Sequence, residues 1–219
     1  VLTFDDGYRD NAVHAYPVLK QHNAPFTVFA TTGFADATAP LWWLDLEEAI
    51  AIQDHITVWL PGGPVLMPTA TAEEKKTAFD TIYWSLRPGP ESALRATIAH
   101  LAAEAGIDPL IRTRELCMRW NELRSLAADP LCTIGAHTLT HPMLAKHATE
   151  VAREEIAASK AIIEEQLGCD VRHLSFPVGD AGSAGPREFS LARAAGFETA
   201  VTTRPGVLFA DHLAHLTAL

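Results

Sequence analysis

The sequence predicts an α/β protein in which parallel strands are joined by crossover helices. Short apolar, β-branched runs alternate with amphipathic helical patterns along most of the chain, and polar residues follow several of these runs directly. Strands that alternate with helices are typical of parallel sheets, because the chain needs a crossover to re-enter the sheet in the same direction. The length of 219 residues suits one domain with a substantial core or a single α/β barrel.

The expected elements follow from the spacing of their apolar residues. The predicted strands cover 1–4, 26–31, 56–60, 131–136, 173–176, 199–203 and 213–217. The predicted helices cover 16–22, 72–86, 91–105, 120–128, 148–167 and 187–195. The helix over 148–167 has the clearest pattern, with Val151, Ile156, Ile163 and Leu167 expected on one face. Gly168 stands where a C-terminal cap belongs.

The segment 33–130 interrupts this alternation. It contains Leu41-Trp42-Trp43-Leu44, then the turn Pro61-Gly62-Gly63-Pro64 between two β-like runs, then two helices separated by Pro88-Gly89-Pro90. We interpret it as an α-rich insertion in one catalytic domain that covers 1–219, in a chain expected to be truncated at both ends. Trp42 and Trp43 are core aromatics in one interpretation and sugar-stacking residues in the other.

Composition excludes several classes of partner. The formal charge is −10, the pI is about 5.4, and no run is rich in Lys or Arg, which argues against nucleic acid or an anionic membrane. No apolar stretch approaches the roughly 20 residues of a membrane span. Three cysteines are too few and too scattered for a disulfide framework or a thiolate zinc site. The cellular compartment stays open.

Two carboxylates and two imidazoles follow predicted strands. Asp5-Asp6-Gly7 comes after 1–4, and His137 and His141 come after 131–136. The carboxyl ends of parallel strands share one edge of the sheet, so these groups are expected to meet. Catalytic zinc takes three His or carboxylate ligands and lowers the pKa of its bound water toward about 7. We therefore predict a hydrolytic metal site, although each motif alone also suits a simple turn or a helix surface.

The same residues resemble a known family. Thr3-Phe4-Asp5-Asp6-Gly7 and His137-Thr138-Leu139-Thr140-His141-Pro142 are similar to the first two motifs of the polysaccharide deacetylases, the NodB-homology or carbohydrate esterase family 4 group. The resemblance extends through Ser175-Phe176-Pro177-Val178-Gly179 and the segment 196–206, which frames most of the chain outside the insertion. It implies a distorted, TIM-like (β/α) barrel of about seven parallel strands. It also implies metal-dependent removal of N-acetyl, sometimes O-acetyl, groups from sugars.

The resemblance implies a role for each matching residue. Asp5 matches the catalytic base, and Asp6, His137 and His141 match the ligands of one divalent metal, for which we expect Zn²⁺ with Co²⁺ as a substitute. Thr138 matches the residue that braces the histidine loop, Pro177 is a second supporting residue, and the backbone N–H of Val178 matches the oxyanion donor. Tyr8, Trp42 and Trp43 are further candidate substrate contacts.

The chain departs from the family pattern at the residue that orients the base. An Arg of that pattern is replaced by Ser175, and Arg172 lies an odd number of residues away on the strand, so it faces elsewhere. Arg204, on the same rim, is the expected substitute.

A second departure concerns the general acid. The family pattern has a His in a Leu-x-His motif near the end of the domain, and His212 and His215 match it poorly. We therefore expect the acid to come from residues after Leu219.

The predicted function is a metal-dependent hydrolase that removes acetyl groups, mainly N-acetyl, from a carbohydrate. A non-haem Fe(II) oxygenase also uses two His and one carboxylate, but with a β-rich barrel and a His-x-Asp spacing that this sequence lacks. A carbohydrate-binding pseudo-enzyme of the same fold is the other alternative, because the orienting Arg and the acid are unassigned.

Overall fold

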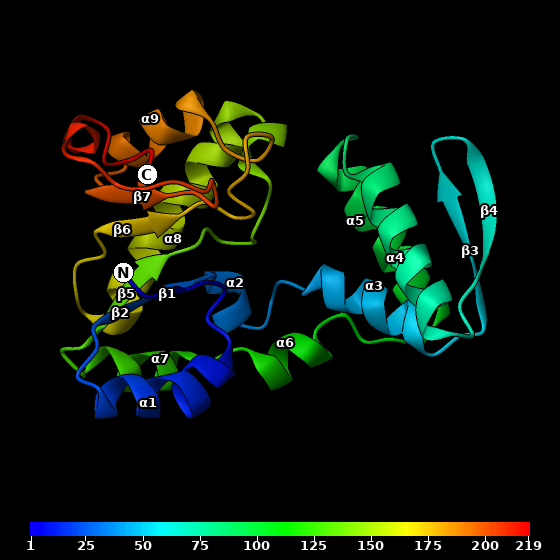
Figure 1. Ribbon diagram of the computed structural model, residues 1–219, viewed down its shortest axis with the longest axis horizontal. Coiled ribbons are helices and arrows are strands. Elements are labelled where there is room, and N and C mark those ends of the chain that lie inside the picture. Colours follow the sequence, from blue (N-terminus) through cyan, green and yellow to red (C-terminus); the bar gives the residue numbers. More distant parts are fainter. The chain divides into compact units, whose positions relative to one another are not determined.

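The computed structural model of the protein describes all 219 residues, and they form two compact units. The first unit consists of Val1–Ala39 and Leu116–Leu219, and the second of Pro40–Glu115. Both ends of the chain therefore belong to the first unit (Figure 1). The second unit is shorter than the insertion expected over 33–130, because the helices that follow Thr31 and Arg119 belong to the first unit.

The first unit is built on a five-stranded parallel sheet in the order β1-β2-β5-β6-β7 (Figure 1). The strands are β1 (Thr3–Phe4), β2 (Phe26–Ala30), β5 (Cys132–Ala136), β6 (His173–Ser175) and β7 (Thr199–Val201). All pairs are parallel, with Phe4 beside Val28 and Ala30 beside Ala136. The predicted parallel α/β architecture is confirmed.

The sheet is curled into a half-barrel. In a flat sheet β1 and β6 would be three strand spacings apart, about 14 Å. Instead, the Ser175 hydroxyl at the end of β6 donates to Asp5 Oδ2 just after β1, at 3.2 Å. The curvature thus brings together side chains that follow β1 and β6, the two strands on either side of the β2–β5 pair.

The strand predicted at 213–217 is wrong. A 3₁₀-helix, η3 (Ala210–Ala214), covers the first two residues of that range, and the remaining three form no strand. Pairing with the sheet begins only after it: Ala200 N donates to Leu216 O, and Thr202 N to Leu219 O, along the free edge of β7. The sheet therefore has five strands with this short added edge rather than about seven.

Helices of the first unit pack along the sheet and against one another. The longer ones are α1 (Tyr16–Gln21), α7 (Trp120–Ala127), α8 (Thr149–Leu167) and α9 (Pro186–Ala194); the shorter ones are η1 (Asn11–Ala15), α2 (Thr32–Ala35) and η2 (Leu144–Lys146). Helix α8 contacts α7 on one side and α9 on the other. It ends at Gly168 in the left-handed conformation (φ 69°), as predicted. Val151, expected on its buried face, is exposed, since the buried face begins one residue later at Ala152.

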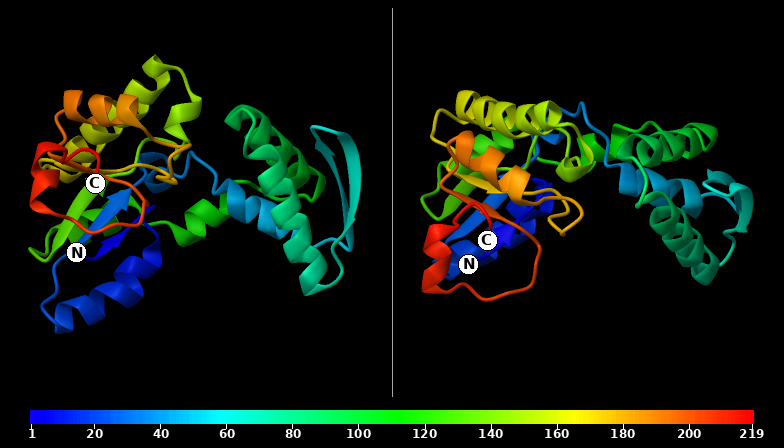
Figure 2. Two further views of the ribbon diagram at one scale, coloured as in Figure 1. Left: turned by 45° about the horizontal axis from the view of Figure 1, so that its top comes forward. Right: turned by 90° about the horizontal axis from the view of Figure 1, so that it is seen from above.

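The second unit has its own apolar core. Its elements are α3 (Trp42–Ala51), β3 (His55–Leu60), β4 (Gly63–Pro68), α4 (Ala72–Leu86), α5 (Glu91–Glu104) and α6 (Ile111–Leu116), which ends at its boundary. The strand expected at 56–60 is one arm of an antiparallel hairpin, β3–β4, outside the parallel sheet (Figure 2). Trp42, Leu46, Ile82 and Leu94 form part of this core. Helices α3 and α6 were not predicted.

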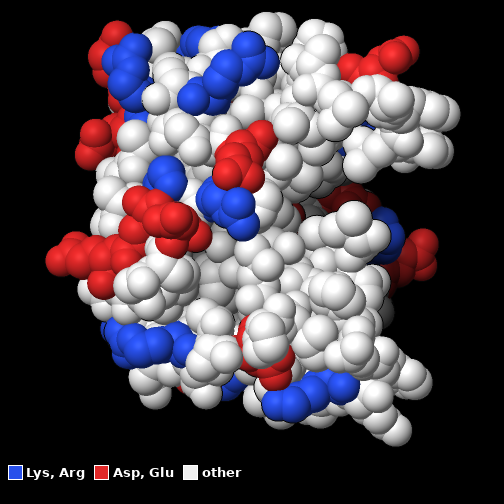
Figure 3. Space-filling view, turned by 90° about the vertical axis from the view of Figure 1, so that its left-hand side faces the viewer, with Lys and Arg blue, Asp and Glu red and all other residues white.

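Lys and Arg side chains lie among Asp and Glu on the face of the molecule drawn in Figure 3. None of the helices combines the length and the hydrophobicity that crossing a bilayer requires.

Candidate metal centre

The carboxylates after β1 lie in a tight turn. Gly7 N donates to Asp5 O at 2.9 Å, which closes a three-residue γ-turn around Asp6. Asp6 has φ 69°, and a γ-turn of this hand is rare and strained for a residue with a side chain. Gly7 also has a positive φ, of 75°, which favours glycine at that position. The turn places two consecutive carboxylates at the carboxyl end of β1.

The histidine loop after β5 is held by the chain that follows β2. His137 N donates to Ala30 O at 2.9 Å, and Gly33 N donates to Leu139 O at 2.8 Å. A Cβ at position 33 would lie 2.6 Å from that carbonyl oxygen, so the approach requires glycine. Thr138 Oγ1 accepts from His141 N at 3.1 Å, which closes the loop on itself.

One hydrogen bond orients the ring of His137. Its Nδ1 lies 2.7 Å from the carbonyl oxygen of Ser175. A carbonyl only accepts, so Nδ1 carries the proton and, in the neutral ring, Nε2 presents its lone pair. That Nε2 lies 3.5 Å from Asp6 Oδ1, and His141 Nε2 lies 3.3 Å from the same oxygen. Three ligand atoms therefore converge on one point.

The donor set fits a divalent cation. Asp6 Oδ1 is buried and accepts no hydrogen bond, although two histidine nitrogens face it. Burial raises the pKa of Asp6; the nearby His137 opposes this, and the Asp5 carboxylate adds to it. In a tetrahedral zinc site with bonds of about 2.0–2.1 Å, ligand atoms are roughly 3.3–3.4 Å apart. Asp6, His137 and His141 form the group of metal-ligating type whose atoms all lie within 4.8 Å of one another.

Asp5 lies beside this group without belonging to it. Its Oδ2 is 4.0 Å from His137 Nε2, and the side chain is 39% exposed, against 17% for Asp6. Ser175 Oγ donates to the same oxygen of Asp5. The two adjacent carboxylates therefore have different surroundings: one is buried among the histidines, and the other is open to solvent.

A second strained turn follows β6. Gly179 N donates to Pro177 O at 2.7 Å, so Val178, at φ 62°, is the centre of another γ-turn. A β-branched residue in this region is an outlier that the rest of the fold must hold in place. Thr203 Oγ1 anchors the turn by donating to Val178 O, at 2.7 Å. The N–H of Val178 donates to no acceptor of the chain, so it is available to a ligand.

Several predicted residues are not brought to this centre. The Arg204 guanidinium donates to Ala184 O and lies over the Phe189 ring, 5.3 Å from its centroid, rather than against Asp5. His212 caps η3 through Phe209 N, and neither it nor His215 contacts the residues above. Tyr8, two residues after Asp6, is half-buried, and its backbone pairs with that of Cys117; it stays a candidate substrate contact.

The paired tryptophans lie in the second unit. Trp42 is buried and stacks on Tyr83, with Trp43 at its edge, 5.4 Å between centroids. Trp42 is thus a core aromatic of that unit.

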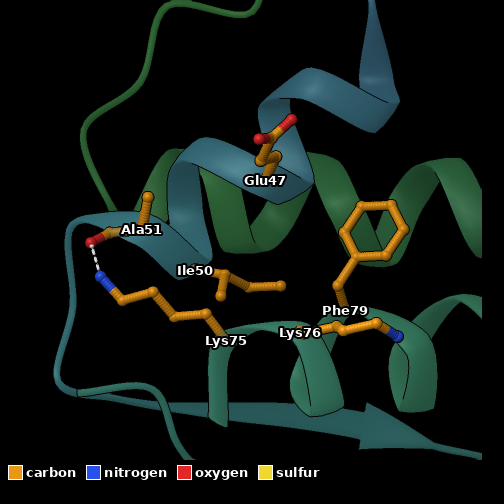
Figure 4. A pocket seen from close by; sticks show the side chains of 6 residues that line it. All are labelled: Glu47, Ile50, Ala51, Lys75, Lys76 and Phe79. Carbon is orange, nitrogen blue, oxygen red and sulfur yellow. Dashed lines mark hydrogen bonds between the residues drawn. The ribbon is translucent and has the colours of Figure 1, made fainter. Parts of the chain in front are cut away.

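The second unit also has a hollow of about 370 Å³ between α3 and α4 (Figure 4). It is lined by Ile50, Ala51, Phe79, two lysines and one carboxylate, Glu47, with no histidine or cysteine. Its chemistry does not suggest a metal site.

Sequence reasoning missed two residues that hold the centre together. Ser175 contacts Asp5 through its hydroxyl and His137 through its carbonyl. Glu155, on α8, accepts hydrogen bonds from the histidine loop. Ser175 was noticed only as the place of a missing Arg. Glu155 had a signal, because it falls three residues after Ala152 and four before Ser159, on the buried face of the helix.

Comparisons with known proteins agree with this fold. The model of the family described as Polysaccharide deacetylase matches residues 1–200, which confirms the resemblance and the predicted class of enzyme. A search among curated protein sequences found no match. Among solved structures, a deacetylase of Streptococcus pyogenes, PplD, in complex with acetate has a TM-score of 0.58 at 16% identity, covering 99% of this chain and 60% of its own. The BpsB deacetylase domain of Bordetella bronchiseptica has a TM-score of 0.58 at 17% identity, with coverages of 100% and 68%.

A polysaccharide deacetylase of Bacillus cereus is similar too, with a TM-score of 0.55 at 14% identity. It is covered over 44% of its length, and this chain over 99%. At such identities the likeness establishes the fold, a curled barrel-like sheet with helices.

Proposed function

Because the chain belongs to the polysaccharide deacetylase family, we propose that it is a metal-dependent hydrolase that removes acetyl groups, mainly N-acetyl, from a carbohydrate. The observation that supports this best is the convergence of Asp6 Oδ1 with the Nε2 atoms of His137 and His141 beside a second, more exposed carboxylate. The chain spans about 60% of the length of the first solved structure that it resembles, so the proposal concerns the part of the protein described here.

Asp6, His137 and His141 would hold the ion, and Zn²⁺ suits two imidazoles and one carboxylate with an open position. When bound, such an ion acidifies water and polarises an acyl oxygen. Co²⁺, which accepts the same ligands, is the expected substitute.

Three groups of the chain serve the attack of water on the acetyl carbonyl, and the leaving amine takes its proton from a general acid other than these three. Asp5, outside the ligand set and open to solvent, accepts the proton of the attacking water. Ser175 Oγ holds the Asp5 carboxylate by a hydrogen bond to Oδ2. The N–H of Val178, fixed in its γ-turn, donates to the oxyanion that forms on the acetyl carbonyl. A fixed donor of this kind typically contributes a few kcal/mol to an acyl transfer.

The test combines metal binding with acetate release. The chain is depleted of metal, titrated with Zn²⁺ by calorimetry, and assayed for acetate released from a chromogenic acetyl ester, whose good leaving group needs no general acid. We expect one zinc per chain and activity that depends on it. His141→Ala should weaken zinc binding to a lower but measurable affinity and abolish activity, whereas His22→Ala, at an exposed histidine of the same unit, should keep both. Zinc binding without any acetate release would instead indicate a carbohydrate-binding pseudo-enzyme.

A further inference from the structure

The buried face of α8 contains a carboxylate. Ala152, Ile156, Ser159 and Ile163 are all fully buried, and Glu155 lies among them with only 8% of its surface exposed. Their spacing of three and four residues is that of a core-facing helical stripe. Burying a charged side chain in such a stripe costs free energy unless its oxygens are hydrogen-bonded. The partners of the Glu155 carboxylate therefore explain why it is tolerated there.

Both oxygens of Glu155 are bonded to one loop. Oε2 accepts from the backbone N–H groups of Leu139 and Thr140, at 2.8 and 2.9 Å. Oε1 accepts from Thr140 Oγ1 at 2.6 Å. Leu139 and Thr140 are two of the three residues between the candidate ligands His137 and His141. The Glu155 carboxylate on α8 therefore binds the middle of the histidine loop by three hydrogen bonds.

That loop requires support. Thr138 has φ 66° and His141 has φ 57°, so two of its five residues lie in the left-handed region that side chains disfavour. Such conformations persist only where the surroundings over-determine them. Hydrogen bonds to an ionised acceptor are about twice as strong as neutral ones, which suits Glu155 to this task.

We infer that Glu155 is a positioning residue of the metal centre. Its carboxylate fixes residues 138–141 in the strained turn that places His141 Nε2 3.3 Å from Asp6 Oδ1. Glu155 acts through the loop and not as a ligand. The inference rests on the proposed metal-dependent function, and it names a residue outside the motifs that identified the site.

The experiment measures zinc affinity rather than turnover. Dissociation constants are determined by competition with a chromogenic chelator for the unmodified chain, Glu155→Gln and Glu155→Leu. Leucine keeps the helical face filled and removes every acceptor, whereas glutamine removes the charge and one of the two acceptor oxygens but keeps the other. Outer partners of metal ligands typically contribute 10–100-fold in metal affinity, and we expect a loss in that range for Glu155→Leu and a smaller one for Glu155→Gln.

Glu188→Gln is the matched control. Glu188 is also buried, at 2% exposure, and accepts from a backbone N–H, that of Gly185, but it does not contact the histidine loop. Its affinity for zinc should stay within about twofold of the unmodified chain, well below the effect of an outer ligand partner. Urea unfolding of each metal-free chain separates affinity from stability.

A second background tests the route of the effect. If Glu155 acts through His141, then Glu155→Leu should weaken zinc binding in the unmodified chain and add nothing to His141→Ala. Unchanged affinity in Glu155→Leu, or an equal loss in the His141→Ala background, would overturn the inference while leaving the metal site intact. Absence of zinc binding in the unmodified chain would overturn the proposed function and this inference with it.

Discussion

The two units differ in where their backbones leave the ordinary conformations. All six non-glycine residues with positive φ lie in the first unit: Asp6, Asn23, Ala37, Thr138, His141 and Val178. In the second unit the residues with positive φ are Gly63 and Gly106, which adopt such conformations without strain. Three of the six, Asp6, Thr138 and His141, lie in the two segments that contain the candidate metal ligands, and Val178 follows β6. Positive φ outside glycine is therefore confined to the unit that contains the candidate site.

The second unit follows local rules closely. Helix α4 begins with a capping box, in which Glu74 N donates to Thr71 Oγ1 and Thr71 N donates to Glu74 Oε2. Its core is apolar, and Gly63 closes the hairpin. In the first unit, side chains from three strand ends must reach one point, and regular turns do not allow that. Substitutions should therefore change chemistry in the first unit and mainly stability in the second.

The largest expected effect is on catalysis. Asp5→Asn should lower kcat by about 10²–10⁴-fold, because a general base is lost, while zinc affinity stays nearly unchanged. The matched Asp54→Asn, at an exposed position of the second unit, should alter neither quantity. Acetate release and zinc titration measure both. Equal loss of zinc from Asp5→Asn and Asp6→Asn would contradict the division between base and ligand.

A cavity in the core of the second unit should lower the free energy of unfolding. Leu94 in α5 is fully buried, and Leu94→Ala should lower the free energy of unfolding by about 2–5 kcal/mol. Four of the five tryptophans, 42, 43, 59 and 84, lie in that unit, so tryptophan fluorescence in urea reports mainly on it. Leu174→Ala, equally buried in β6, is the counterpart in the first unit. If both variants shift the fluorescence transition equally, the units do not unfold separately.

The second unit also contains a carboxyl group that titrates near neutrality. Burial, together with the Glu48 and Asp108 carboxylates, raises the pKa of Asp45 from 3.8 to about 7. The fold therefore favours the protonated form, so this contribution to stability is complete below pH 3.8 and is lost as the pH rises through about 7.

Asp45→Asn should remove that dependence, which amounts to at most about 1.4 kcal/mol per pH unit within the window. Glu47→Gln, on the exposed side of the same helix, should keep it. Urea unfolding at about pH 5 and about pH 8 compares the three chains. A variant Asp45→Asn that retains the full pH slope would show that another group titrates.

The smallest effect distinguishes two candidate partners of the base. Ser175→Ala removes one hydrogen bond to the Asp5 carboxylate, and a contribution of about 1.5–3 kcal/mol for a charged acceptor corresponds to a roughly 12- to 160-fold lower kcat. Arg204→Ala should leave kcat nearly unchanged, since its guanidinium lies against Ala184 and Phe189. The reverse order of effects would favour Arg204 as the orienting residue, as the sequence suggested.

Local patterns were sufficient for most elements. Helix α4 begins and ends at the predicted residues, and Gly168 ends α8 as expected, because capping and apolar periodicity act over a few neighbours. The short helix α2 and helices α3 and α6 were missed. Helix α2 has four residues, and its shape depends on the histidine loop that its first amides hold. The segment that pairs with the free edge of β7 was predicted at 213–217, but the pairing involves Leu216 and Leu219. Which residues pair there depends on how the chain returns to the curled sheet, and a local pattern does not contain that information.

The sequence by itself determined the alternation of strands and helices and the residues that meet at the candidate metal centre. Asp5, Asp6, His137 and His141 follow strands, and parallel strands end at a common edge. Only the tertiary structure decided which groups support them. Ser175 replaces the expected Arg204 beside Asp5, and Glu155 reaches the histidine loop from α8. These partners are joined through the curvature of the sheet and the packing of a helix, over separations of 170 and 16 residues, which no local pattern encodes.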